Sequence, residues 1–139
     1  MVSDDPTHIS FAVNLMSGFF TALLAMLVAK TTIMLGKLAM VGRSGDIEQS
    51  SVLALCGAGL VAGLTTAFCT SIWFSAVEGE VYAMSTFFTG LTFWAAVRWY
   101  YKDDSPQNDR WLIFVDFSAA LSIGVHLLSI LTFLSLIHI

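Results

Sequence analysis

Long apolar segments alternate with short polar ones along the whole chain. Four segments reach or exceed about 20 residues, at residues 9–29, 52–77, 81–101 and 111–137. A helix of that length crosses the hydrocarbon core of a bilayer, whereas barrel strands alternate apolar and polar positions over about ten residues. No such alternation runs through these segments. The pattern therefore predicts an all-α integral membrane protein with four transmembrane helices, in a single domain covering residues 1–139.

The composition points to lipid as the surroundings of most of the chain. Of its 139 residues, 57% are hydrophobic and only 12% are charged, whereas about a quarter of the residues of a soluble domain are charged. In hydrocarbon every backbone polar group must be satisfied within the protein, which favours helices. The chain opens with the acidic stretch "MVSDDPTH" and not with the basic region of a signal peptide. We therefore expect the first apolar segment to be retained.

All basic residues fall on one side of the membrane if the four helices cross in turn. These residues are Lys30, Lys37, Arg43, Arg98, Lys102 and Arg110. The opposite side carries four carboxylates and no Lys or Arg, the carboxylates being Asp4, Asp5, Glu78 and Glu80. The positive-inside rule then places both termini outside and the two basic loops in the cytoplasm, or in the matrix or stroma of an organelle.

The first apolar segment keeps its pattern beyond Lys30, up to about Val41. We interpret this as a helix that continues near or beyond the membrane surface as a roughly amphipathic segment. A helix that leaves the bilayer at a tilt is the alternative. The stretch "GRSGD" at residues 42–46 should end it, and Asp46 is a plausible N-cap for the next helix.

Two stretches of the chain are nearly identical. "MSGFFTAL" occupies residues 16–23 and "MSTFFTGL" occupies residues 84–91. We interpret them as a tandem repeat of a helical hairpin, whose two copies share one orientation and are related by an axis along the membrane normal. A chance likeness among membrane helices, which draw on few residue types, is the alternative.

Small residues recur at helical spacing in the second and fourth segments. The positions are Gly59, Gly63, Ala67 and Ser71 in the second segment, and Ser118 and Ser122 in the fourth. In lipid, helices associate through close packing of small and hydroxyl residues, so we expect these stripes to form helix contacts, with a pore lining as the alternative. Cys56 and Cys69 lie about 20 Å apart on one helix and should be packing residues.

Two ionisable residues of the fourth segment are candidates for function because charge within a membrane is costly. Asp116 should pair with Arg98, or with Lys30 if the repeat is real, and a cation or proton site is the alternative. His126 should lie near mid-membrane and donate or accept a hydrogen bond. The two lie about 15 Å apart along a helix, too far to touch.

The remaining polar candidates are weaker. Haem ligation by His126 would need a second histidine at its depth, but His8 and His138 lie near the outer ends. Asn14 should form a hydrogen bond between helices.

The sequence gives no motif for an enzyme or a cofactor. It contains no HExxH, CxxC, P-loop or GxGxxG sequence, so we expect no catalytic, cofactor or metal site and no nucleic-acid partner. We expect an accessory subunit packed into a larger, energy-transducing membrane complex, with lipid and other subunits or copies of itself as partners. The alternative is a small homo-oligomeric channel or transporter that uses Asp116 and His126.

Overall fold

The computed structural model describes residues 6–43, 45–79, 81–101 and 108–130. These residues form five α-helices and one short 3₁₀ helix, and no strand occurs among them. The helices are α1 (Pro6–Val41), α2 (Gln49–Phe68), α3 (Thr70–Val77), α4 (Tyr82–Tyr101) and α5 (Asp109–Val125), and the 3₁₀ helix is η1 (Leu127–Ile130). The prediction of an all-helical chain is therefore confirmed for the described residues.

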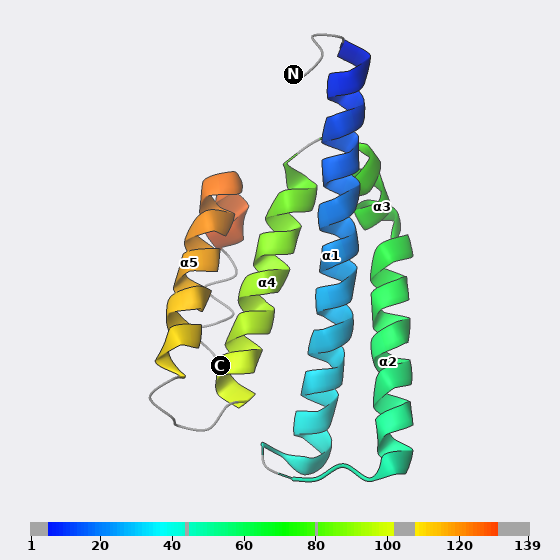
Figure 1. Cartoon of the computed structure of the whole chain (residues 1–139), viewed down its shortest axis with the longest axis vertical. Helices are drawn as coiled ribbons and strands as arrows, with labels where there is room; N and C mark the ends of the chain where they lie inside the picture. The colour runs from blue at the N-terminus through cyan, green and yellow to red at the C-terminus, as the bar shows by residue number, and fades with distance from the viewer. Residues whose placement is uncertain (1–5, 44, 80, 102–107, 131–139) are drawn as a thin grey trace.

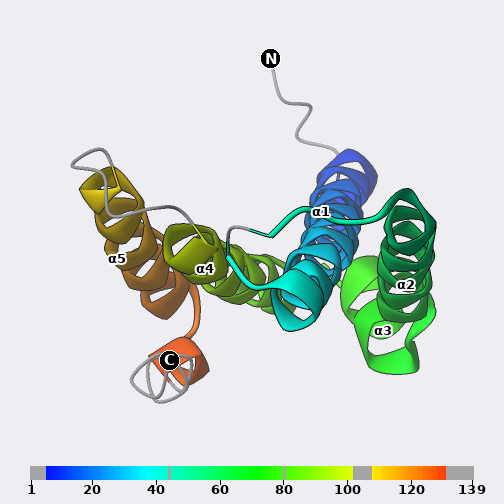
Figure 2. The ribbon, with the colours of Figure 1, turned by 90° about the horizontal axis from the view of Figure 1, so that it is seen from below.

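The four long helices stand side by side in one layer, in the order α5, α4, α1, α2 (Figures 1 and 2). Helix α1 is central because it packs against α2 and α3 on one side and against α4 on the other. Its N-terminal turns project beyond the other helices (Figure 1). Helix α5 packs against α4 alone among the long helices.

Two of the described helices, α1 and α2, are long and apolar enough to cross a membrane. The prediction of four spanning helices is therefore not confirmed, since among the described helices only these two qualify by length and composition. Helix α5 has 17 residues and ends at Val125, so the expected segment 111–137 is not one continuous helix. Its last residues, 131–137, lie outside the described part of the chain.

The exposed surface is strongly apolar, which suits lipid surroundings. Phe11, Leu53 and Ile113 expose 68%, 79% and 68% of their surface, and many other large apolar side chains are similarly open. Water-soluble monomers rarely expose contiguous apolar areas of this kind. The apolar surface and the lengths of α1 and α2 therefore both agree with association of the protein with a membrane.

The expected helix over residues 52–77 is interrupted at Cys69. This residue has an extended backbone (φ −62°, ψ 131°), which ends α2 and starts α3. No proline or glycine marks the break. The Thr66 hydroxyl donates to the Ala62 carbonyl oxygen at 2.9 Å, a side-chain bond that bends helices, and the Cys69 N–H bonds the Thr66 carbonyl in a tighter turn.

Helix α1 continues to Val41, as the apolar pattern predicts. Gly42 then adopts a left-handed conformation (φ 71°), and its N–H bonds the Leu38 carbonyl oxygen, which closes the helix. The predicted N-cap is wrong, because Glu48 and not Asp46 precedes the first turn of α2. The Glu48 side chain makes no capping bond, and its carbonyl oxygen accepts the N–H of Ser51 instead.

Glycines bring α1 and α2 into close contact. A β-carbon on Gly59 would lie 2.6 Å from Ile33 Cγ1 and 3.0 Å from the Ala29 carbonyl oxygen. At Gly63 it would lie 3.1 Å from Ala29 Cβ and 3.2 Å from the Ala25 carbonyl oxygen. Backbone approach of this kind is how helices associate in lipid.

Hydroxyl groups join α4 to α5 and η1. Ser85 bonds Ser129 with 2.9 Å between the two oxygens, and Thr89 bonds Ser122 at 3.3 Å. The third pair, Thr92 and Ser118, lies at 3.2 Å, and both residues are almost fully buried. Two of these bonds lie along the seam between α4 and α5, and the Ser85–Ser129 bond joins α4 to η1. The repeated stretches themselves meet across α1 and α4, where the Phe20 ring contacts Phe87 and Phe88.

Candidate functional site

The α3–α4 turn and the C-terminal end of α5 lie at the same end of the bundle (Figure 1), which we call the acidic end and define by Glu78, Tyr82 and His126. Glu78 caps the C-terminus of α3 and Tyr82 is the first residue of α4. The ring centroids of Tyr82 and His126 lie 5.3 Å apart. A phenol and an imidazole are thus in contact at this end, and the Glu78 carboxylate lies four residues before Tyr82 in the turn that leads into α4.

Helix α5 ends because His126 adopts an extended backbone (φ −153°, ψ 125°). The His126 N–H still bonds the Ser122 carbonyl oxygen at 3.0 Å, and its own carbonyl accepts the Ser129 N–H at 3.0 Å. The peptide groups at this break are therefore satisfied. The expected position of His126 near mid-membrane assumed an unbroken helix; the structure places it at the helix end, beside Tyr82.

The acidic turn is held against α1 by a glycine. A β-carbon on Gly79 would lie 2.8 Å from Val13 Cγ1 and 3.0 Å from Asn14 Oδ1, so a larger residue fits only if these two side chains or the turn shift. Asn14 therefore lies against the turn. Glu80, Asp4 and Asp5 lie outside the described residues.

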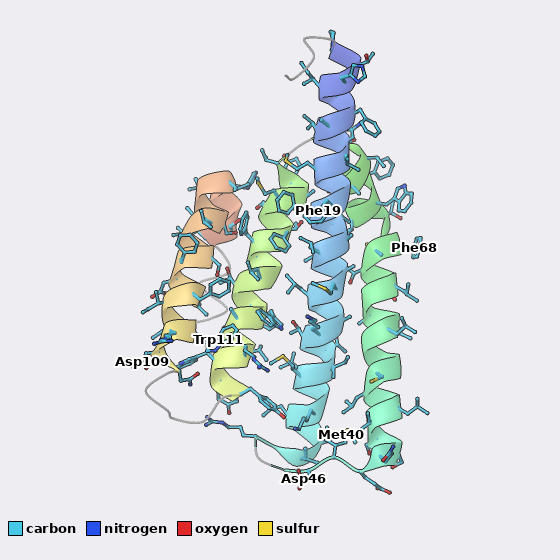
Figure 3. The ribbon with its side chains drawn as sticks, viewed as in Figure 1. Phe19, Met40, Asp46, Phe68, Asp109 and Trp111 are labelled. Atoms are coloured by element: carbon cyan, nitrogen blue, oxygen red, sulfur yellow. The ribbon has the colours of Figure 1, made fainter. Side chains whose placement is uncertain are left out.

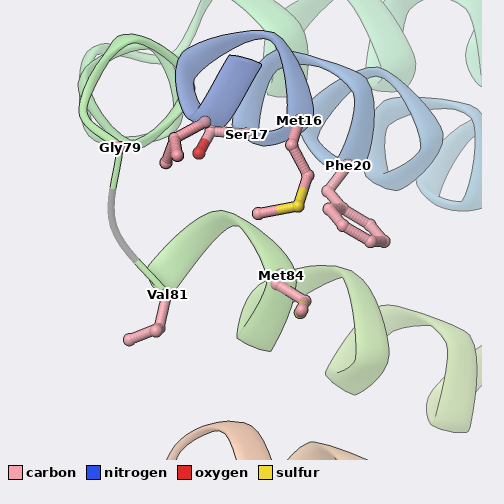
Figure 4. Close-up of a pocket in the computed structure, with 7 residues that line it drawn as sticks. Met16, Ser17, Phe20, Gly79, Val81 and Met84 are labelled. Atoms are coloured by element: carbon pink, nitrogen blue, oxygen red, sulfur yellow. The ribbon is translucent and has the colours of Figure 1, made fainter. Parts of the chain in front are cut away.

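A cavity of about 190 Å³ opens between this turn, α1 and α4. It is lined by Val13, Met16, Ser17, Phe20, Gly79, Val81 and Met84. Figure 4 shows Met16 and Phe20 of α1 pointing toward Met84 of α4. The lining is almost entirely apolar, so the cavity offers contact to an apolar group next to the polar residues of the acidic end.

The opposite end carries the basic residues, and we call it the arginine end, defined by Arg43, Arg98 and Arg110. The Arg98 guanidinium lies over the Trp111 ring with 5.8 Å between Cζ and the ring centroid, and Arg43 lies over Tyr100 at 5.3 Å. These are cation–π geometries.

The expected ion pair of Asp116 is not formed. Asp116 is exposed on α5, and no ion pair within 4 Å is found for it in the described part of the chain. Arg98 is turned to Trp111 instead, and Lys30 is exposed on α1. The sequence could not show on which side of α5 Asp116 would lie.

No group of three or more His, Cys, Asp or Glu side chains that could hold a metal occurs among the residues described. His8 lies in the first turn of α1 and is exposed, and His138 lies outside the described residues. Cys56 and Cys69 are exposed free cysteines.

Sequence reasoning missed the pairing of Tyr82 with His126. Tyr82 marks a helix start and His126 stands within a long apolar segment, so neither local pattern predicts the contact. Chemically, an imidazole and a carboxylate are the side chains that most often accept a proton from a reacting hydroxyl. The acidic end contains both kinds of side chain, Glu78 and His126.

No curated protein and no solved structure matches the chain. The family model described as "Protein O-mannosyl-transferase TMEM260 N-terminal domain" matches residues 1–139. This match overturns the expectation of an accessory subunit of an energy-transducing complex, and its alternative of a channel or transporter. It also contradicts the expectation that the chain has no part in an enzyme, since the family is named for a transferase. Over its whole length, the chain belongs to the family of the N-terminal domain of the protein O-mannosyl-transferase TMEM260.

Proposed function

We propose that this chain is a membrane-embedded part of a protein O-mannosyl-transferase and that mannose is transferred at its acidic end. The observation that carries the proposal is the family match over all 139 residues. The apolar helices α1 and α2 agree with an enzyme part held in a membrane. The acceptor would be a hydroxyl group of a protein, as the name of the family states.

The reaction requires one bond to form and one to break. The acceptor oxygen bonds the anomeric carbon of an activated mannose, the bond from that carbon to its leaving group breaks, and the hydroxyl proton passes to a base. Glu78 and His126 are the proton acceptors at the acidic end among the described residues. The cavity lined by Met16, Phe20 and Met84 would hold an apolar part of a substrate beside them.

The orientation of the helices in the membrane is part of the proposal. We propose that α4 and α5 also cross the bilayer, with the acidic end outside and the arginine end in the cytoplasm. The distribution of Lys and Arg supports this orientation. This orientation also fits a duplicated hairpin, because α1 packs against α2 and α4 packs against α5. The repeated stretches of the two pairs contact each other through the rings of Phe20 and Phe87.

Labelled mannose transfer to a protein acceptor tests the proposal, using membranes that contain the protein as the cell makes it. His126→Ala and Glu78→Gln should each lower the rate, by about 100-fold for a residue that acts as general base. Asp116→Asn is the matched control, since it removes a carboxylate from an exposed position on α5, the helix that ends just before His126. Equal activity of all three variants and the unaltered protein would contradict the placement of the reaction.

A further inference from the structure

An aromatic cavity lies at the arginine end, at the base of the α4–α5 pair. Its volume is about 440 Å³, and its lining is Trp94, Arg110, Trp111 and Phe114. Pockets of about 300–1,000 Å³ with apolar walls and few polar groups are the usual size of ligand sites. The cavity is far from the acidic end, because Trp111 lies in the first turn of α5 whereas His126 follows its last.

The walls of the cavity are built as a rigid aromatic cluster. Trp94 and Trp111 meet edge to face with 5.7 Å between ring centroids, and Trp111 meets Phe114 in the same way at 6.1 Å. All three side chains pack on the buried residues Ala95, Ala96 and Val115. The small alanines let the large rings lie close to the seam between the helices.

Positive charge borders the cavity on the side nearest the end of the bundle. Arg110 contributes to the lining, and Arg98 lies over Trp111, one helical turn beyond Trp94. The exposed carboxylate of Asp109 is also at this end, in the first turn of α5 (Figure 3). Guanidinium groups thus outnumber the carboxylate two to one among the described residues beside the cavity.

Because arginines border an aromatic cavity, we propose that the cavity binds a membrane phospholipid with an anionic headgroup. The headgroup phosphate would lie against Arg98 and Arg110, and an acyl chain would lie along Trp94, Trp111 and Phe114. Basic pockets between transmembrane helices on the cytoplasmic side bind such headgroups, and arginine matches phosphate oxygens in a bidentate manner. The cavity is thus polar at its rim and apolar inside, which matches the polar headgroup and the apolar acyl chain of a lipid.

The site rests on the proposed membrane orientation, in which α4 and α5 cross the bilayer, but not on the proposed transfer of mannose. Its residues lie at the opposite end from Glu78 and His126, so lipid binding can be measured without mannose. A failure of mannose transfer at the acidic end leaves the lipid site standing.

Native mass spectrometry of the purified protein in detergent tests the proposal. Phosphatidylglycerol and phosphatidylcholine with identical chains are offered in turn, and the bound lipid is counted. We expect stronger retention of phosphatidylglycerol, reduced about fivefold by either Arg98→Gln or Arg110→Gln. Asp109→Asn should raise retention because it removes the opposing charge.

Arg43→Gln is the matched control, because Arg43 lies at the same end but over Tyr100, outside the cavity lining. It should leave lipid retention unchanged. Trp94→Ala should weaken both lipids alike, and inorganic phosphate at the same concentration should not displace either. Equal retention of the two lipids, or an equal loss with Arg43→Gln, would overturn the proposal.

A photo-crosslinking phenylalanine analogue at position 114 identifies the occupant directly in membranes. Crosslinks to phospholipid support the proposal. Crosslinks to a segment of the chain itself, such as residues 131–139, or to another protein would overturn it.

Discussion

Gly59 offers the most quantitative test of how α1 and α2 are held together. Alanine at this position would bring a β-carbon within 2.6 Å of Ile33 Cγ1 and 3.0 Å of the Ala29 carbonyl oxygen. The Ile33 side chain can adjust, but the carbonyl belongs to the α1 backbone. Forcing an extra carbon into a packed interface costs about 1–3 kcal/mol, whereas replacing a helical glycine by alanine gains about 0.5–1 kcal/mol. The net expectation is a loss of up to about 2.5 kcal/mol, and of about 1–3 kcal/mol relative to an alanine that replaces a glycine without such contacts.

Gly57 is the matched control on the same helix, because nothing lies within 4 Å of a β-carbon placed there. Gly57→Ala should therefore be neutral or slightly stabilising. Titration from mild detergent into sodium dodecyl sulfate, followed by tryptophan fluorescence, measures the free energy of helix separation for both variants.

In an Ile33→Ala background, Gly59→Ala should cost less than it does in the unaltered protein, since one of the two close contacts is removed. If Gly59→Ala proved as stable as Gly57→Ala, the proposed close approach of α1 and α2 would be refuted.

Three further predictions use the same protein. Gly42→Ala should lose about 1–2 kcal/mol in the detergent titration, since a β-carbon is strained at φ 71°; an unchanged midpoint would show that the α1 terminus is not left-handed. Ser85→Ala removes a buried 2.9 Å bond to Ser129 and should lose about 0.6 kcal/mol in the same titration; a stabilised variant would argue against this bond. Gly79→Ala should lower mannose transfer about tenfold or more by displacing the acidic turn from α1, while Gly124→Ala, with open space around its β-carbon, keeps full activity; equal rates for the two would show that this turn does not position the reaction.

Hydrophobic length predicted the helices well where one apolar run makes one helix. The continuation of α1 to Val41 follows from apolar spacing that persists beyond Lys30, and Gly42 ends it because glycine tolerates a left-handed backbone. Helix α4 (Tyr82–Tyr101) likewise agrees closely with the expected segment 81–101.

The breaks within apolar segments could not be predicted in this way. Cys69 and His126 interrupt segments that contain no proline at those points, and both breaks are stabilised by local hydrogen bonds that leave hydropathy unchanged. Lipid surroundings require that such bonds be satisfied internally, but they do not reveal where. The location of His126 beside Tyr82 depends on the second of these breaks.

The expectation of a structural role failed for a chemical reason. Catalytic motifs are recognisable in sequence when a metal or a nucleotide phosphate imposes fixed spacing on its ligands. Transfer of a sugar to a hydroxyl needs an activated donor, an aligned acceptor and a base, and these can come from distant helices. The two proton acceptors that we propose, Glu78 and His126, are 48 positions apart in the sequence, so no contiguous motif would mark them.

Mannose transfer measured separately on each side of sealed vesicles tests most directly whether the reaction takes place at the acidic end. In a variant whose exposed Cys56 and Cys69 are replaced by alanine, a single cysteine is introduced by Val77→Cys, at an exposed position beside Glu78, or by Arg43→Cys. Labelling with a membrane-impermeant maleimide then shows which end of the bundle faces each side of the vesicle. An impermeant peptide with serine and threonine acceptors is then supplied to one side at a time. We predict that the peptide receives mannose only when the peptide is on the side where Val77→Cys is labelled. Mannose transfer only on the side where Arg43→Cys is labelled would contradict the placement of the reaction at the acidic end.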